Sequence, residues 1–170
     1  REGRLAERDG EAGPLTGVPA SIRDLIGGWL SQLSPPGSDA VAVAAAMGID
    51  FTVDAVAACC AESPVRLMPL LEQAVTLSLL DPGDPGHFRF SHSLVRESIL
   101  AGVSAPRLAR IHAQIAQGLE RHYGAEAETR AAQLAHHFGA AGGLAGTDSH
   151  VRYALLAGEQ AISRHAYEDA

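Results

Sequence analysis

One short stretch of the sequence combines a side chain that could do chemistry with a backbone position that suits it. Residues 90–97 read Phe-Ser-His-Ser-Leu-Val-Arg-Glu and follow a Pro/Gly-rich segment, which puts His92 between a short strand and the first turn of a helix. Backbone N–H groups at a helix start point outward and favour an anion. An imidazole there can donate a hydrogen bond to a phosphate held by a neighbouring domain. The alternative is that His92 only caps the helix or packs at the junction.

Other patterns that would support catalysis or metal binding are missing from the sequence. It contains no GxxxxGK phosphate loop, no GxSxG elbow, no HExxH and no CxxC. None of its eight histidines stands four residues from another, and the neighbours His136 and His137 point to different faces of a helix, so we expect no metal site. Cys59 and Cys60 are adjacent, which disfavours an unstrained disulfide and indicates two small residues in the packing. We therefore predict that the segment is not an enzyme.

A predicted β-hairpin leads directly into the stretch that contains His92. Residues 81–86, Asp-Pro-Gly-Asp-Pro-Gly, form a turn between two short strands, and Phe88 and Phe90 fall on the same face of the second strand. Apolar periodicity predicts earlier helices over about 20–33, 35–47 and 53–60, and another that starts at 63–64. Four helices precede the hairpin here, and three helices followed by a hairpin is the order of a winged-helix domain, in which the hairpin is the wing.

Capping residues mark where these helices begin. Serine followed by proline at 34–35 and at 63–64 supplies an N-cap hydroxyl and a proline at the first helical position. Thr52 is expected to cap the helix after it, and Ser91 the helix after the hairpin. Residues 49–51 are expected to be no more than a short bridge.

The chain after the hairpin reads as helices that stack away from it. They are expected from His92 onward, from about 104 to a break at Gly124, and over about 126–140 and 148–165. Their expected inner faces combine small residues with single large ones, as in superhelical helix repeats. These residues include Ala131, Ala135, Ala154, Gly158 and Ala161, beside Leu134, Phe138, Tyr153, Leu155 and Ile162. Residues 166–170 read as the start of a further repeat, cut short.

These elements predict a mainly α fold, with a winged-helix-like domain that contains one short β-hairpin, followed by TPR-like antiparallel helical hairpins. The expected division is a linker or frayed end over 1–17, the winged-helix-like domain over 18–103, and a helical repeat region over 104–170 that is truncated at its C-terminus. Because the chain starts at Arg1 without a methionine and stops inside a helical pattern, we expect it to be a piece of a longer protein.

Composition limits the classes of partner. The net charge is −7, lysine is absent, and thirteen arginines are scattered among twenty acidic residues. A free-standing DNA-binding domain usually carries a basic stripe, because phosphate neutralisation supplies most of its affinity, so we expect no direct nucleic-acid contact. The longest purely apolar run falls far short of the ~20 residues of a membrane span, and no signal peptide precedes it. A cytoplasmic protein without a membrane partner is therefore expected.

Four segments occur in an order that is typical of one protein family. They are residues 18–26 (VPASIRDLI), 44–51 (AAAMGIDF), 90–97 (FSHSLVRE) and 108–112 (LARIH). Across about residues 18–170, the series resembles the region just after the ATPase core of large bacterial STAND regulators. These include the large LuxR-type transcriptional activators and the related adenylate-cyclase-like multidomain proteins.

The resemblance implies a P-loop ATPase domain upstream, which would hold ATP or ADP with Mg²⁺, and tetratricopeptide-like repeats downstream. The segment itself would hold no cofactor. Residues 90–95 also resemble the Met-His-Asp motif of NB-ARC domains, whose histidine reaches the β-phosphate of bound ADP and holds the inactive state. His92 matches that histidine, whereas Ser91 and Ser93 replace the methionine and the aspartate. Arg96 is a second candidate for the same site, and its alternative is a surface ion pair.

The function that the resemblance implies is a regulatory module. It would couple the nucleotide state of the upstream domain to the helical repeats and an output domain, with a protein or small-molecule inducer as a further partner. Two alternatives stay open. One is a winged helix that binds DNA itself, against which the acidity counts; the other is a helical scaffold for protein partners without nucleotide coupling.

Overall fold

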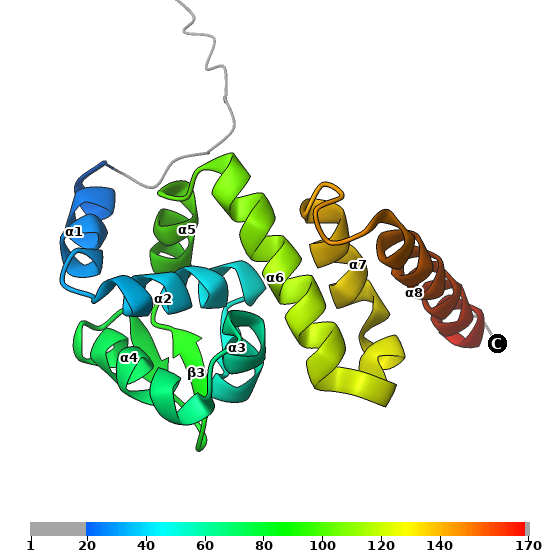
Figure 1. Cartoon of the computed structure of the whole chain (residues 1–170), viewed down its shortest axis with the longest axis horizontal. Coiled ribbons are helices and arrows are strands. Elements are labelled where there is room, and N and C mark those ends of the chain that lie inside the picture. The colour runs from blue at the N-terminus through cyan, green and yellow to red at the C-terminus, as the bar shows by residue number, and fades with distance from the viewer. Residues whose placement is uncertain (1–19, 169–170) are drawn as a thin grey trace, which may run out of the picture.

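The computed structural model describes residues 20–168, which form a mainly helical structure with one small sheet (Figure 1). The predicted class, mainly α with a short hairpin, is confirmed. The predicted linker over 1–17 lies outside the described residues. The elements are α1 (Ala20–Leu30), α2 (Pro35–Met47), β1 (Asp50–Thr52), α3 (Val53–Cys60), α4 (Pro64–Thr76), β2 (Leu80–Pro82), β3 (His87–Phe90), α5 (Ser93–Ala101), α6 (Ala105–Tyr123), the 3₁₀ helix η1 (Gly124–Arg130), α7 (Ala131–Ala140) and α8 (Thr147–Glu168).

The sheet has β3 at its centre, because β1 and β2 both pair with it in antiparallel orientation. Phe51 of β1 lies opposite Phe88, and the Phe51 ring centroid is 6.1 Å from that of Phe88 and 5.7 Å from that of Phe90. All three rings are buried, so the shared inner face predicted for Phe88 and Phe90 is confirmed. The prediction that residues 49–51 are only a bridge is wrong, because β1 pairs with β3 there. The sequence does not reveal this strand, since three residues are too few to show an alternating pattern.

The first part of the chain has the topology of a winged helix. Its elements follow in the order α2, β1, α3, α4, β2 and β3, the sheet order is β1-β3-β2, and the β2–β3 hairpin is the wing. The Ser34 hydroxyl accepts a hydrogen bond from the Gly37 N–H at 3.3 Å, and the Thr52 hydroxyl accepts one from the Ala55 N–H at 3.2 Å. These two predicted caps are therefore confirmed, and each satisfies a backbone donor that the helix leaves free. Ser63 occupies the N-cap position of α4, but its hydroxyl makes no capping hydrogen bond.

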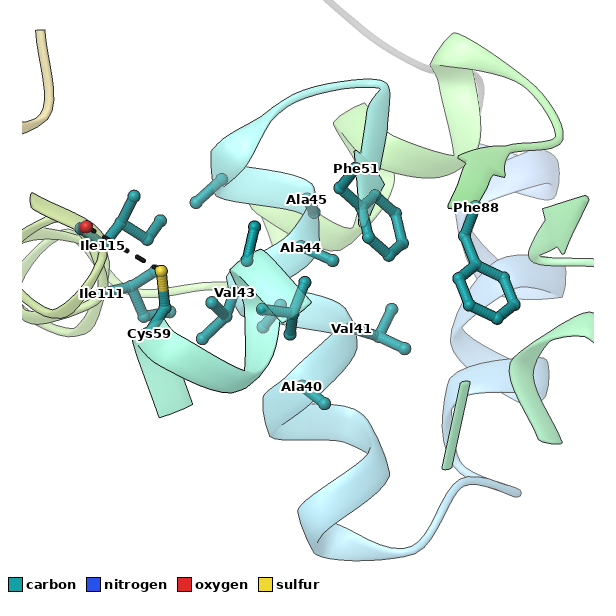
Figure 2. Close-up of a cluster of buried hydrophobic side chains, with 14 of the residues drawn as sticks. Ala40, Val41, Val43, Ala44, Ala45, Phe51, Cys59, Phe88, Ile111 and Ile115 are labelled. Atoms are coloured by element: carbon teal, nitrogen blue, oxygen red, sulfur yellow. Dashed lines mark hydrogen bonds between the residues drawn. The ribbon is translucent and has the colours of Figure 1, made fainter. Parts of the chain in front are cut away.

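Helix α2 runs through the middle of the core, and its small side chains let other helices approach closely. Residues 40–46 of α2 are all buried. Figure 2 shows the side chains of Val43 and Cys59 beside those of Ile111 and Ile115 on α6. The Cys59 thiol donates a hydrogen bond to the Ile115 carbonyl, with 3.8 Å between sulfur and oxygen.

Helix α6 joins the winged helix to the helical region. It packs against α3 and α2 on one side and against α7 on the other (Figure 1). At Gly118, an added Cβ atom would stand 2.6 Å from the Cys59 Cα and 2.9 Å from the Ala58 carbonyl oxygen. One hydrophobic cluster includes residues from Ile26 in α1 to Tyr153 in α8. The domain boundary expected near residue 104 therefore lies in a loop, while the core continues across it.

Helices α6, α7 and α8 run alternately in opposite directions and form the expected antiparallel hairpins (Figure 1). The rings of Phe138 and Tyr153 stack 5.6 Å apart between α7 and α8. The inner face predicted for α8 is correct only at Tyr153. The other residues predicted to lie on it are exposed: Ala154, Leu155, Gly158, Ala161 and Ile162. Residues 166–168 continue α8, so they do not start a further repeat.

Two other element boundaries differ from the prediction. The first helix ends at Leu30 and not at Leu33, and the stretch before α7 is the 3₁₀ helix η1 rather than part of one helix over 126–140. Within the described residues, α1 to α8 include none with the length and apolar character needed to cross a membrane.

Candidate functional site

The junction between β3 and α5 holds His92 in a defined conformation. Phe90 is buried at the end of β3, and the Ser91 hydroxyl donates a hydrogen bond to the Ser78 carbonyl at 2.8 Å. Ser91 therefore fastens the junction to the turn before β2. The prediction that Ser91 caps the helix is wrong, because His92 occupies the N-cap position of α5.

The imidazole of His92 caps α5 with one nitrogen and leaves the other for an external partner. Its Nδ1 accepts a hydrogen bond from the Leu94 N–H at 3.3 Å, and the side chain is exposed. A neutral imidazole has one protonated and one unprotonated nitrogen, so a ring that accepts at Nδ1 carries its proton on Nε2. Neutral His92 thus keeps an Nε2–H donor. Its geometry confirms the role of helix cap and is also compatible with a contact to a phosphate.

His92 lies at the edge of a hollow of about 380 Å³ between α1 and α5. Apolar side chains make most of its lining, with three polar residues among them. The lining residues are Leu25, Ile26, Trp29, Ser78, Ser91, His92, Leu94 and Val95. Among these described residues there is no arginine or lysine, so a phosphate would meet one imidazole and two hydroxyl groups. Among the described residues, this hollow therefore offers an anion no cationic side chain.

Arg96 lies elsewhere, although it is one turn after His92 on the same helix. Its side chain is half-buried, and its Nε donates a hydrogen bond to the Ala45 carbonyl in α2 at 2.7 Å. The guanidinium therefore ties α5 to α2. The structure does not bring His92 and Arg96 into one site, and the described contact of Arg96 is also not the surface ion pair considered as its alternative.

The faces that a winged helix would present to DNA are poor in positive charge. Residues 20–103 contain four arginines and nine acidic residues, a net charge of −5. Arg66 is the one basic residue in the sequence of α4, and it pairs with Glu62 at 3.5 Å. On the sheet, Arg89 pairs with Asp50 at 2.6 Å. These two arginines already have carboxylate partners, which leaves little charge to neutralise DNA phosphates.

Three histidines from two helices meet between α6 and α7. The imidazole rings of His112, His136 and His137 have centroids 5.1 to 5.6 Å apart. His136 is exposed and His137 is buried, so the two point to different faces of α7 as predicted, yet both rings reach His112. Spacing within one helix could not reveal this cluster, because His112 is contributed by the preceding helix.

Burial changes the acidity of this cluster. Burial, with smaller effects of the neighbouring His112 and His136, lowers the pKa of His137 to about 3. Burial also lowers the pKa of the half-buried His112, with a smaller effect from His136. His112 and His137 are therefore neutral at physiological pH.

Comparisons with known proteins add no family to this description. No family model matches the chain, and the searches of curated proteins and of solved structures found no significant match.

Proposed function

We propose that this chain is a relay module of a STAND-type, LuxR-like transcriptional regulator in the cytoplasm. In this proposal, an upstream P-loop domain holds ADP or ATP with Mg²⁺, and His92 contacts a phosphate of bound ADP. Loss of that contact moves the winged helix together with the helical hairpins, which then act on an output domain or respond to an inducer. In this proposal the module itself holds no nucleotide and catalyses no reaction.

The packing of α6 is the observation that carries the proposal. A relay needs a mechanical connection, and α6 contacts both the winged helix and α7. Gly118 allows the backbones of α6 and α3 to approach closely, and the Arg107 guanidinium reaches the Asp39 carboxylate in α2 at 2.5 Å. Because packed helices have few alternative arrangements, a movement of the winged helix would carry α6 and the first helical hairpin with it.

The position of His92 supports its role as the contact that changes. Within the part of the chain that the structure describes, its Nε2–H has no acceptor and the hollow beside it lacks a cationic side chain. A single imidazole contact is weak enough to be made and broken as the nucleotide changes. A ligand shifts a conformational equilibrium only by its difference in affinity for the two states, and one such contact supplies this difference.

The rate of ADP release from the longer protein tests this proposal. His92→Ala should raise the rate at least tenfold, which corresponds to about 1.4 kcal/mol of lost contact. His87→Ala is a matched control, because His87 is an exposed histidine on β3 that does not line the hollow. An unchanged rate in His92→Ala would contradict the proposed contact.

A protein-interaction scaffold is the second candidate, and the outer face of α8 favours it. Val151, Leu155 and Ile162 are 49%, 65% and 72% exposed, and their spacing places them along one side of the helix. Such a face can bind a protein without any nucleotide. The scaffold function would be supported if the longer protein binds its protein partner with the same affinity in the presence of ADP, in the presence of ATP and without nucleotide.

Direct DNA binding is the least supported function. The acidic winged helix and the paired arginines argue against it. Direct DNA binding would be supported if the isolated chain shifts DNA in a gel and if this binding weakens steeply with added salt.

A further inference from the structure

The three histidines between α6 and α7 are arranged as metal ligands would be. His112 comes from α6, and His136 and His137 come from α7. One nitrogen from each imidazole can be chosen so that all three lie within 4.8 Å of one another. His137 is buried, His112 is half-buried, and His136 is exposed, so the cluster is closed on the core side and open toward solvent.

Two of these nitrogens lie so close together that either a proton or a metal ion must lie between them. The Nδ1 atoms of His112 and His137 are 2.9 Å apart. Two unprotonated ring nitrogens at this distance would repel each other, because both lone pairs face the same space. Without a metal ion, one ring must therefore donate an Nδ1–H to the other. With a metal ion, that ring moves its proton to Nε2, and both Nδ1 lone pairs face the ion.

We propose that His112, His136 and His137 bind one divalent transition-metal ion of the zinc class, with the fourth position open to water. Three neutral imidazoles are suitable ligands for Zn²⁺, which binds histidine nitrogen at about 2.0–2.1 Å and prefers a tetrahedral arrangement. Magnesium and calcium are disfavoured, because they prefer oxygen ligands and the cluster has none.

Small movements bring the cluster to the geometry of such a site. In a tetrahedral zinc site, ligand nitrogens are about 3.3 Å apart. The 2.9 Å between the Nδ1 atoms of His112 and His137 must therefore widen slightly. The exposed imidazole of His136 can rotate inward without disturbing the core.

Neutral rings favour this binding, since protonated imidazoles cannot ligate a metal. His137 is buried and His112 is half-buried, and burial disfavours the charged form of an imidazole. The bound ion would clamp α6 to α7 and stiffen the first helical hairpin. This inference is independent of the proposed relay function.

Zinc titration of the 170-residue chain tests the site. After treatment with EDTA and removal of the chelator, isothermal titration with ZnCl₂ should detect one bound ion per chain, and zinc should raise the thermal unfolding temperature. His136→Ala should weaken zinc binding at least tenfold and remove the rise in unfolding temperature. His122→Ala is the matched control, because His122 is exposed on α6 and lies outside the cluster.

Because His136 is exposed, its replacement should leave the far-ultraviolet circular dichroism spectrum unchanged. Co²⁺ provides a second readout, since the wild-type protein should show the visible absorption bands of a four-coordinate ion and His136→Ala should lose them. The proposal is overturned if wild-type protein binds no zinc, or if it binds zinc no more tightly than His136→Ala does.

Discussion

The two ring nitrogens of His92 differ in their contacts. Nδ1 accepts the Leu94 N–H and caps α5, whereas the Nε2–H is the group that we propose contacts a phosphate outside the chain. The sequence could predict the imidazole at a helix start but not the division of its nitrogens, because serine is a common N-cap and Ser91 stands just before it. Ser91 is used instead to bond the Ser78 carbonyl.

Cys59 predicts how stability changes at alkaline pH. Burial, with a smaller effect of Cys60, raises the pKa of its thiol from 9.0 to about 12. The unfolded chain therefore loses this proton at a pH where the folded protein keeps it. The contribution to stability is fully present below pH 9 and is lost as the pH rises toward 12. Urea unfolding should show a loss of about 1 kcal/mol from this residue between pH 8 and pH 10.

Cys59→Ala is the control for this prediction, because it removes the thiol and leaves a small apolar side chain. The sequence contains no lysine, so Cys60 and the tyrosines are the main other side chains that titrate in this range. Their effect remains in the variant. A variant that loses stability as steeply as the wild type between pH 8 and pH 10 would refute the role assigned to Cys59.

At the scale of elements, the contact between α3 and α6 depends on the absence of a side chain at Gly118. An added Cβ would stand 2.6 Å from the Cys59 Cα, which is backbone and cannot rotate away. Gly118→Ala should therefore destabilise the protein by about 1–3 kcal/mol, although alanine is the better helix former. The free energy of unfolding in urea measures this loss.

Gly158→Ala provides the matched comparison. Gly158 also lies inside a helix, α8, but an added Cβ meets nothing within 4 Å there. This substitution should stabilise the protein by about 0.5–1 kcal/mol through helix propensity alone. If Gly118→Ala and Gly158→Ala change the free energy of unfolding in the same direction, α3 and α6 are not packed as described.

Local signals in the sequence predicted most of these elements, whereas contacts between elements were harder to predict. The caps at Ser34 and Thr52 and the Pro/Gly hairpin depend on residues a few positions apart, so they are visible in the sequence. Strand β1 depends on pairing with residues 87–89, and the histidine cluster depends on two helices meeting. The inner face predicted for α8 is wrong except at Tyr153, because Leu155 and Ile162 are exposed although large apolar side chains usually face a core.

At the scale of the whole molecule, α6 packs against both the winged helix and α7, so we expect the two parts to move as one body. This predicts a single narrow distance between spin labels on the two parts. Suitable label positions are Val65 on α4 and Leu155 on α8, which are 82% and 65% exposed, in a chain whose native cysteines are replaced by alanine. Pulsed electron paramagnetic resonance measures this distance. A broad or two-peaked distribution would mean that the two parts move independently and could not transmit a displacement.

The release of ADP from the longer protein that carries His92→Asn tests the relay most directly. Asparagine is a good N-cap residue, so this variant keeps the bond to the Leu94 N–H and removes the imidazole Nε2–H. If His92 senses phosphate, ADP release should accelerate at least tenfold, as in His92→Ala. If release returns to the wild-type rate, His92 serves only as a helix cap, and the proposed contact with the nucleotide is wrong.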